Sequence, residues 1–87
     1  MIAETRETRI KRLHMRSMRR GMKEMDLILS AFAQDRLAQM DDAALAQYDA
    51  LLNENDQDLY AWVIEQTEAP EVFAGLLADI AAHVGAR

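Results

Sequence analysis

Residues that interrupt helices are rare in this chain of 87 amino acids. It contains three glycines, one proline and no cysteine, and 51% of its residues are hydrophobic, with Ala, Leu and Met prominent among them. These three residues favour helices, and a chain of this length can close only one modest core. We therefore predict an all-α protein, a compact bundle of about five short helices that forms a single domain over residues 1–87, with residues 1–10 frayed.

Apolar spacing and the few breakers predict where the helices begin and end. The first helix is expected over residues 3–19, followed by Gly21 in the left-handed conformation that glycine adopts without steric cost. A second, central helix is expected over residues 22–38. Its apolar stripe is continuous, so it should contact most of the other helices.

The remaining three helices are predicted from capping residues. Asp41 or Asp42 can cap the third helix and Asp56 the fourth, while Pro70 suits the first position of the fifth, which runs to about residue 83 and ends at Gly85. The core positions expected from helical spacing are Ile10, Leu13, Met18, Met25, Ile28, Leu29, Phe32, Ala33, Leu45, Tyr48, Leu51, Leu52, Leu59, Trp62, Val63, Phe73, Leu76, Leu77, Ile80 and Val84.

The charge of the chain is divided between a basic start and an acidic body. Residues 1–25 carry eight Lys or Arg and three acids, a net charge of +5, and the remaining residues carry two basic and twelve acidic side chains, a net charge of −10. A basic segment can bind nucleic acid, anionic lipid or an acidic protein surface. Because the acidic body would repel a polyanion, we expect no nucleic-acid partner and keep a nucleic-acid-binding module, or another protein-interaction module that uses this segment, as the alternative.

The sequence also bears on location. No apolar run approaches the roughly 20 residues that span a bilayer, and the start lacks the apolar stretch of a secretory signal. Glu4 and Glu7 interrupt the Arg-rich start, whereas mitochondrial transit peptides are poor in acids. We therefore expect a cytoplasmic protein without membrane insertion.

The residues that commonly carry catalysis do not form a recognisable set. The three glycines are too far apart for a phosphate loop, and neither His14 nor His83 has a second ligand at metal-binding spacing. Ser17 and Ser30 lack a histidine–acid relay. We therefore predict a protein that is not an enzyme and holds no metal or tightly bound cofactor of its own; an enzyme using Glu24 with His14 is a minor alternative.

The segment from Arg19 to Asp26 joins the first two predicted helices. It brings together a bidentate donor, Arg20, a bare backbone, Gly21, and a carboxylate, Glu24. Such a corner suits close contact with a partner, because Gly21 has no side chain to hold two surfaces apart. In the plainer interpretation, Gly21 only ends a helix and Arg20 only pairs with Glu24.

This segment resembles the RGxxE signature of the succinate dehydrogenase flavinylation factors, which are small helical proteins. The signature reads Arg20-Gly21-Met22-Lys23-Glu24 and continues through Met25 and Asp26. Further similarity lies in residues 16–19, 26–29, 32–33, 51–52 and 56–62, so that the resemblance spans about residues 13–80. It implies a chaperone that binds the flavoprotein subunit of succinate dehydrogenase, and of the related fumarate reductase, and promotes covalent attachment of FAD to a histidine of that subunit.

The resemblance also implies which residues contact the partner. Arg20, Gly21 and Glu24 match the signature and are the first candidates. The neighbouring candidates are Met22, Asp26, Arg19 and Lys23. Trp62 also matches a family position, but its spacing from Leu59 favours a place in the core.

Overall fold

Five α-helices and one short 3₁₀ turn account for most of the protein. The computed structural model describes residues 4–86, and within them no strand occurs. The elements are α1 (Arg6–Ser17), α2 (Lys23–Arg36), η1 (Leu37–Gln39), α3 (Asp42–Leu51), α4 (Asp56–Val63) and α5 (Glu71–Ala86). The predicted all-α class is confirmed.

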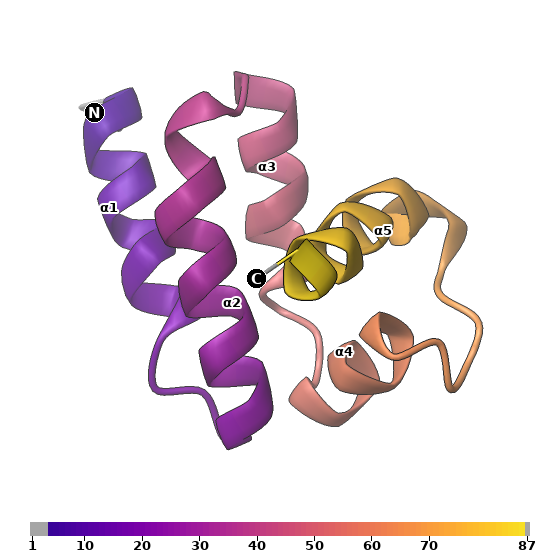
Figure 1. Ribbon diagram of the computed structural model, residues 1–87. Helices are drawn as coiled ribbons and strands as arrows, with labels where there is room; N and C mark the ends of the chain where they lie inside the picture. Colours follow the sequence, from indigo (N-terminus) through magenta and orange to yellow (C-terminus); the bar gives the residue numbers. More distant parts are fainter. Residues whose placement is uncertain (1–3, 87) are drawn as a thin grey trace.

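The helix α2 is the centre of the arrangement (Figure 1). It contacts α1 on one side and α4 and α5 on the other, while α3 contacts α1 and α5. The first three helices run alternately down and up, and α4 and α5 lie together beyond them. The predicted central position of the second helix is therefore confirmed.

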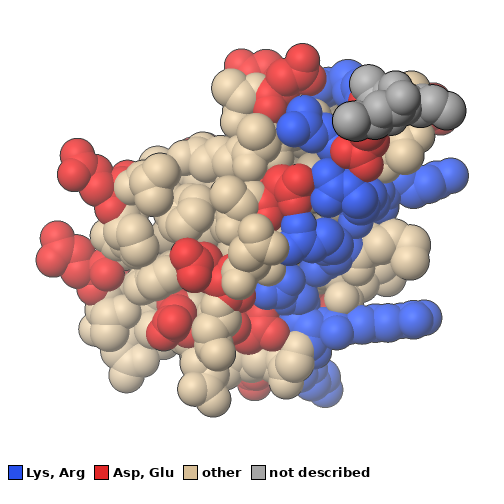
Figure 2. All heavy atoms as spheres, turned by 180° about the vertical axis from the view of Figure 1, so that it is seen from behind, with Lys and Arg blue, Asp and Glu red and all other residues tan. Residues whose placement is uncertain are grey.

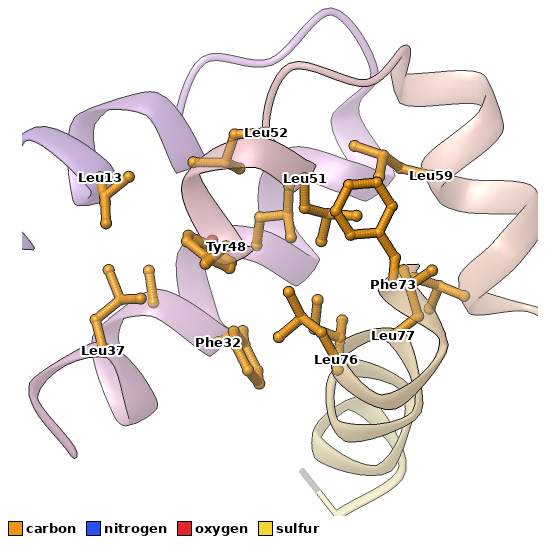
Figure 3. Packing of buried hydrophobic residues seen from close by; sticks show 14 of the residues in the cluster. Leu13, Phe32, Leu37, Tyr48, Leu51, Leu52, Leu59, Phe73, Leu76 and Leu77 are labelled. Atoms are coloured by element: carbon orange, nitrogen blue, oxygen red, sulfur yellow. The ribbon is translucent and has the colours of Figure 1, made fainter. Parts of the chain in front are cut away.

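Apolar faces of all five helices meet in one core (Figure 3). Phe32 of α2 and Tyr48 of α3 stack with ring centroids 5.9 Å apart, and the leucines of α3 and α5 surround them. Two predicted core residues lie elsewhere, since Met18 is 50% exposed and Val84 42% exposed. Ile10, Ile28 and Trp62 are half-buried and pack against the core from its edge. Met18 lies beyond the end of α1 and Val84 lies in the last turn of α5, where few neighbours cover them.

A buried polar pair links α1 to α3 inside this core. The Ser17 hydroxyl donates to the Leu13 carbonyl at 2.8 Å, so the Tyr48 hydroxyl, 2.6 Å from Ser17 Oγ, is left to donate to it. Both residues are fully buried. Burial raises the pKa of Tyr48 to about 12, and the hydrogen bond to Ser17 offsets part of that effect.

The first helix is shorter than predicted at both ends. Thr5 caps it by accepting from the amide of Thr8 at 3.1 Å, so helix begins inside the segment expected to be frayed, of which residues 1–3 lie outside the described chain. The helix ends at Ser17. The left-handed residue that follows is Arg19, with φ 54°, and Gly21 has no positive φ. The prediction that Gly21 ends the helix in that conformation is wrong, because the chain has already turned two residues earlier.

The other helix ends lie close to their predicted positions, but several are formed by residues other than those predicted. Asp41 caps α3 by accepting from the amide of Ala44, as predicted. Asn55, and not Asp56, caps α4, and Pro70 lies just before α5 rather than in its first turn. Gly85 does not end α5, which continues to residue 86.

Candidate protein-binding site

The side chain of Arg20 turns into the molecule. Its Nε donates to Asp56 Oδ1 at 2.7 Å, and its Nη1 donates to the carbonyls of Arg16 at 3.2 Å and Leu52 at 3.1 Å. Only 12% of the side chain is exposed. The sequence suggests a pair between Arg20 and Glu24, but Arg20 pairs with Asp56 because the α1–α2 loop directs its guanidinium toward α4.

Asp56 binds both of the first two residues of the signature. While Oδ1 accepts from Arg20, Oδ2 accepts from the amide of Gly21 at 2.9 Å. Asp56 is also the first residue of α4, where the helix dipole favours a negative charge. One carboxylate therefore holds the α1–α2 loop against the start of α4. The sequence pointed to Asp56 only as a cap, so its main role was missed.

Asp26 has a similar internal role. Its Oδ2 accepts from the amide of Arg19 at 3.1 Å, and its Oδ1 accepts from the hydroxyl of Ser30, also at 3.1 Å. The bond from the Arg19 amide stabilises the left-handed backbone conformation of Arg19, which is unfavourable for a residue other than glycine. Asp26, in the first turn of α2, is thus partly buried against the loop, whereas the side chain of Arg19 is exposed.

Four of the predicted contact residues, Gly21, Met22, Lys23 and Glu24, line an open hollow, which we call the outer corner, whereas the exposed Arg19 lies outside it. Its lining residues are Gly21, Met22, Lys23, Glu24, Asn55, Asp56 and Gln57. Glu24 is exposed, and among residues 4–86 no ion pair or side-chain hydrogen bond of Glu24 is found. Lys23 is likewise exposed, and Met22 is half-buried against the core.

The fold does not require a glycine at position 21. Its φ is not positive, and a Cβ placed on it would meet only Asp56 Oδ2, at the ordinary contact distance of 3.5 Å. The residue is exposed at the edge of the outer corner. The space above its backbone is therefore open to a second molecule.

The basic residues form a band along one side of the molecule (Figure 2), and much of this charge is used internally. Arg12 donates to Glu4 and to Asp49 of α3, and Arg16 donates to Asp49 and to Asn53. The hydrogen bonds from Arg12, together with the positive charges of Arg12 and Arg16, hold the pKa of Asp49 below its usual value. The band therefore fastens α1 to α3.

Arg6 continues this band, pairing with Asp42 and donating to the carbonyls of Ala38 and Met40. Together with Arg12, Arg16 and Arg20, it makes up half of the eight basic residues in the first 25. These four guanidinium groups already have carboxylate partners, whereas Arg9, Lys11, Arg19 and Lys23 form no ion pair among residues 4–86. The expectation of no nucleic-acid partner therefore depends on the acidic body of the chain.

The two histidines differ in their surroundings. His14 is half-buried on α1. His83, in the last turn of α5, is packed edge-on against Phe32 at 5.6 Å, and its Nε2 lies 2.7 Å from Asp35 Oδ2. Its Nδ1 is buried without a hydrogen-bond partner. The described part of the chain has no group of three residues arranged to hold a metal ion.

The arrangement defines a class of protein. Five helices close one core, the signature residues meet at a loop corner, and part of that corner presents an open backbone and an unpaired carboxylate to solvent. None of the helices described is both long and apolar enough to cross a membrane. These features are those of a small helical bundle with one exposed loop corner.

Comparison with known proteins identifies the family. A family model described as flavinator of succinate dehydrogenase matches residues 11–84, so the chain belongs to that family. It is 40% identical to succinate dehydrogenase assembly factor 2 of Danio rerio over 79 residues, covering 88% of this chain and 50% of that protein. The Schizosaccharomyces pombe protein of the same name is 43% identical over 68 residues, covering 78% of this chain and 49% of its own. The chain thus spans about half the length of the curated relatives it matches.

The comparisons also correct the predicted location. The relatives from Danio rerio, Meyerozyma guilliermondii and Schizosaccharomyces pombe are all named as mitochondrial proteins. They point to the mitochondrion, and the prediction of a cytoplasmic protein is contradicted. That prediction depended on the acids Glu4 and Glu7 and on the lack of an apolar stretch at the start, neither of which identifies a compartment.

Proposed function

We propose that this chain binds the flavoprotein subunit of succinate dehydrogenase, and of the related fumarate reductase, and promotes the covalent attachment of FAD to it. The family match over residues 11–84 carries this proposal. Relatives named as succinate dehydrogenase assembly factors support it. The chain acts as a chaperone in this proposal and not as an enzyme, and the flavoprotein supplies the histidine that takes the flavin.

The outer corner is the proposed contact surface. Gly21 has no side chain although the fold would accept one, which allows a partner's backbone to approach the loop closely. Glu24 presents an unpaired carboxylate beside it, able to accept hydrogen bonds from partner amides or basic side chains. Met22 and Lys23 add an apolar and a basic contact at the same corner.

Arg20 acts differently in this proposal. Three of its nitrogens are engaged within the chain, including Nη2, which donates to the Glu54 carbonyl at 3.4 Å. We assign Arg20 as a positioning residue that holds Gly21 and the start of α4 in place. This assignment revises the expectation that its guanidinium grips the partner.

FAD is assigned to the partner and not to this chain. FAD carries a diphosphate, whereas the outer corner is lined by two carboxylates, Glu24 and Asp56, and only one basic residue, Lys23, while Arg20 points inward. The chain as a whole has a formal charge of −5. Repulsion between these carboxylates and the phosphates disfavours a flavin site on this chain alone.

Reconstitution with the purified apo-flavoprotein subunit tests this function. The subunit is incubated with FAD, with and without the chain, and covalent flavin is read as fluorescence in a denaturing gel. The same chain, tagged, is used to retain the subunit on resin. We expect the wild type to raise covalent flavin and to retain the subunit. Equal fluorescence with and without the chain would overturn the proposal.

Variants at the corner locate the contact. Gly21→Arg should abolish retention of the subunit, because a long side chain fills the approach, and Gly21→Ala should weaken it more mildly. Glu24→Gln should weaken retention by removing a charge. Glu7→Gln removes one exposed carboxylate from the first turn of α1 and serves as the matched control. If Gly21→Arg retains the subunit as well as the wild type, the outer corner is not the contact surface.

A further inference from the structure

A second hollow lies at the opposite end of α4 from the outer corner. It is bounded by the last turn of α4, the connection over residues 65–69 and one face of α5, and its volume is about 670 Å³. The eight residues of α4 separate the two sites by about 12 Å along the helix axis. This hollow, the acidic groove, is defined by Trp62, Glu65, Glu68, Glu71, Ala74 and Ala78.

The floor of the acidic groove is apolar and made of small side chains. Ala74 and Ala78 are four residues apart on α5, so they lie one above the other on the same helix face, and both are exposed. Trp62 forms the facing wall and is half-buried. An apolar side chain or a segment of backbone can therefore approach α5 closely beside an aromatic ring.

The rim of the groove carries one sign of charge only. Glu65, Glu68 and Glu71 are all exposed, and no Lys, Arg or His lines the groove. Within residues 4–86 none of the three carboxylates forms an ion pair or a side-chain hydrogen bond, in contrast to Glu4, Asp49 and Asp56. The C-terminal end of α4 adds a partial negative charge here, while the N-terminal end of α5, at Glu71, adds a partial positive one, so the three carboxylates set the sign of the groove.

From this combination we propose that the acidic groove binds a basic segment of a partner protein. The segment would carry Lys or Arg side chains on either side of a small apolar residue. The apolar residue would rest on Ala74 and Ala78, one cation would lie over the indole of Trp62, and the others would pair with the three glutamates. Polyanions are excluded by the same charges. This site does not depend on the flavinylation proposal.

The chain provides its own probe for this site, because Trp62 is its only tryptophan. We would titrate the full chain with the synthetic peptide acetyl-AKAARAAKA-amide and follow Trp62 fluorescence at low and high salt. A peptide with glutamine in place of every Lys and Arg is the matched ligand. The expected result is a saturable fluorescence change with the basic peptide alone, weakening as salt rises.

Two triple variants distinguish binding in the groove from general attraction by the negative charge of the chain. Glu65→Gln/Glu68→Gln/Glu71→Gln should weaken binding by about tenfold, the sum of three exposed ion pairs. Glu7→Gln/Asp58→Asn/Asp79→Asn removes the same number of exposed carboxylates away from the groove and should bind as the wild type does. Circular dichroism of each variant confirms that it folds.

The other outcomes overturn the proposal. Equal weakening by the two triple variants would mean general attraction between opposite charges. No salt-sensitive fluorescence change would mean that the groove does not bind basic segments. Sedimentation of the peptide-free chain at low salt tests whether a second copy of this chain occupies the groove. If the wild type self-associates and the groove variant does not, the occupant is another copy and not a segment of a different protein.

Discussion

The two ends of α4 use carboxylates in opposite ways. At its start, both oxygens of Asp56 accept hydrogen bonds from the α1–α2 loop, through Arg20 and Gly21. At its other end, Glu65, Glu68 and Glu71 surround a groove and have no such partners among the described residues. A sheltered, paired charge is costly to disturb, whereas exposed, unpaired charges contribute little to stability. The first end therefore maintains the fold, and the second is available to other molecules.

The largest effect is expected at the paired end. Arg20→Ala leaves Asp56 Oδ1 and the carbonyl of Leu52 without the donor that Arg20 supplies. The side chains of Arg20 and Asp56 are largely sheltered, at 12% and 17% exposure. We expect a loss of about 3 kcal/mol in the free energy of unfolding, measured by urea denaturation.

The control for this prediction is a double-mutant cycle with Asp56→Ala. The two single substitutions should each destabilise the chain, and the double variant should lose clearly less than their sum, because each removes the same interaction. If Arg20→Ala is as stable as the wild type, the contrast between the two ends of α4 fails.

A second prediction compares this ion pair with the buried, uncharged pair of Ser17 and Tyr48. Tyr48 has a pKa of about 12 in the folded chain, above its unfolded value of about 10, so the folded state retains the proton longer. Its contribution to stability is fully present below pH 10 and is lost as pH rises toward 12, on the order of 2–3 kcal/mol. Denaturation curves across this range should show the loss in the wild type and a smaller one in Tyr48→Phe. If the stability of the wild type and that of Tyr48→Phe fell equally with pH, the prediction would be wrong.

The smallest effect is expected at the unpaired end and has the opposite sign. Glu65 has φ 61°, a backbone conformation that costs a residue with a side chain but not glycine. Glu65→Gly should therefore stabilise the chain by about 1 kcal/mol, seen as a higher melting temperature. Glu68→Gly, a change on the same rim at a residue without a positive φ, should not stabilise it. A destabilised Glu65→Gly variant would show that the carboxylate supports the fold.

The helices and most of the core could be predicted from the sequence, because apolar residues recur at helical spacing. Leu29, Phe32, Leu45 and Tyr48 are all buried as expected. The site could not be predicted as completely. Arg20 and Asp56 are 36 residues apart, and nothing local to either one indicates that they meet. Capping patterns likewise could not show that Asn55 would cap α4 and leave Asp56 free for the loop.

The errors at the helix ends have a common physical origin. The sequence predicts a left-handed turn at Gly21, since glycine adopts it most easily, but the chain places that turn at Arg19 and secures it with Asp26. Trp62 was expected in the core from its spacing to Leu59, yet it lies at the boundary between core and groove. Tertiary contacts outweighed local preference in each case.

The attachment of α1 has a consequence for the motions of the protein. Only Leu13 and Ser17 of this helix are buried, whereas four residues of α2 are, and much of what holds α1 is its row of arginine contacts. Such an element can open as a separate unit while the other helices stay folded, and added salt would make that opening more frequent. Amide hydrogens of α1 would then exchange with solvent sooner than those of α2. Since the loop bearing Gly21 continues directly from α1, each opening would also strain the contact of this loop with Asp56 at the outer corner, and a bound partner would slow the exchange.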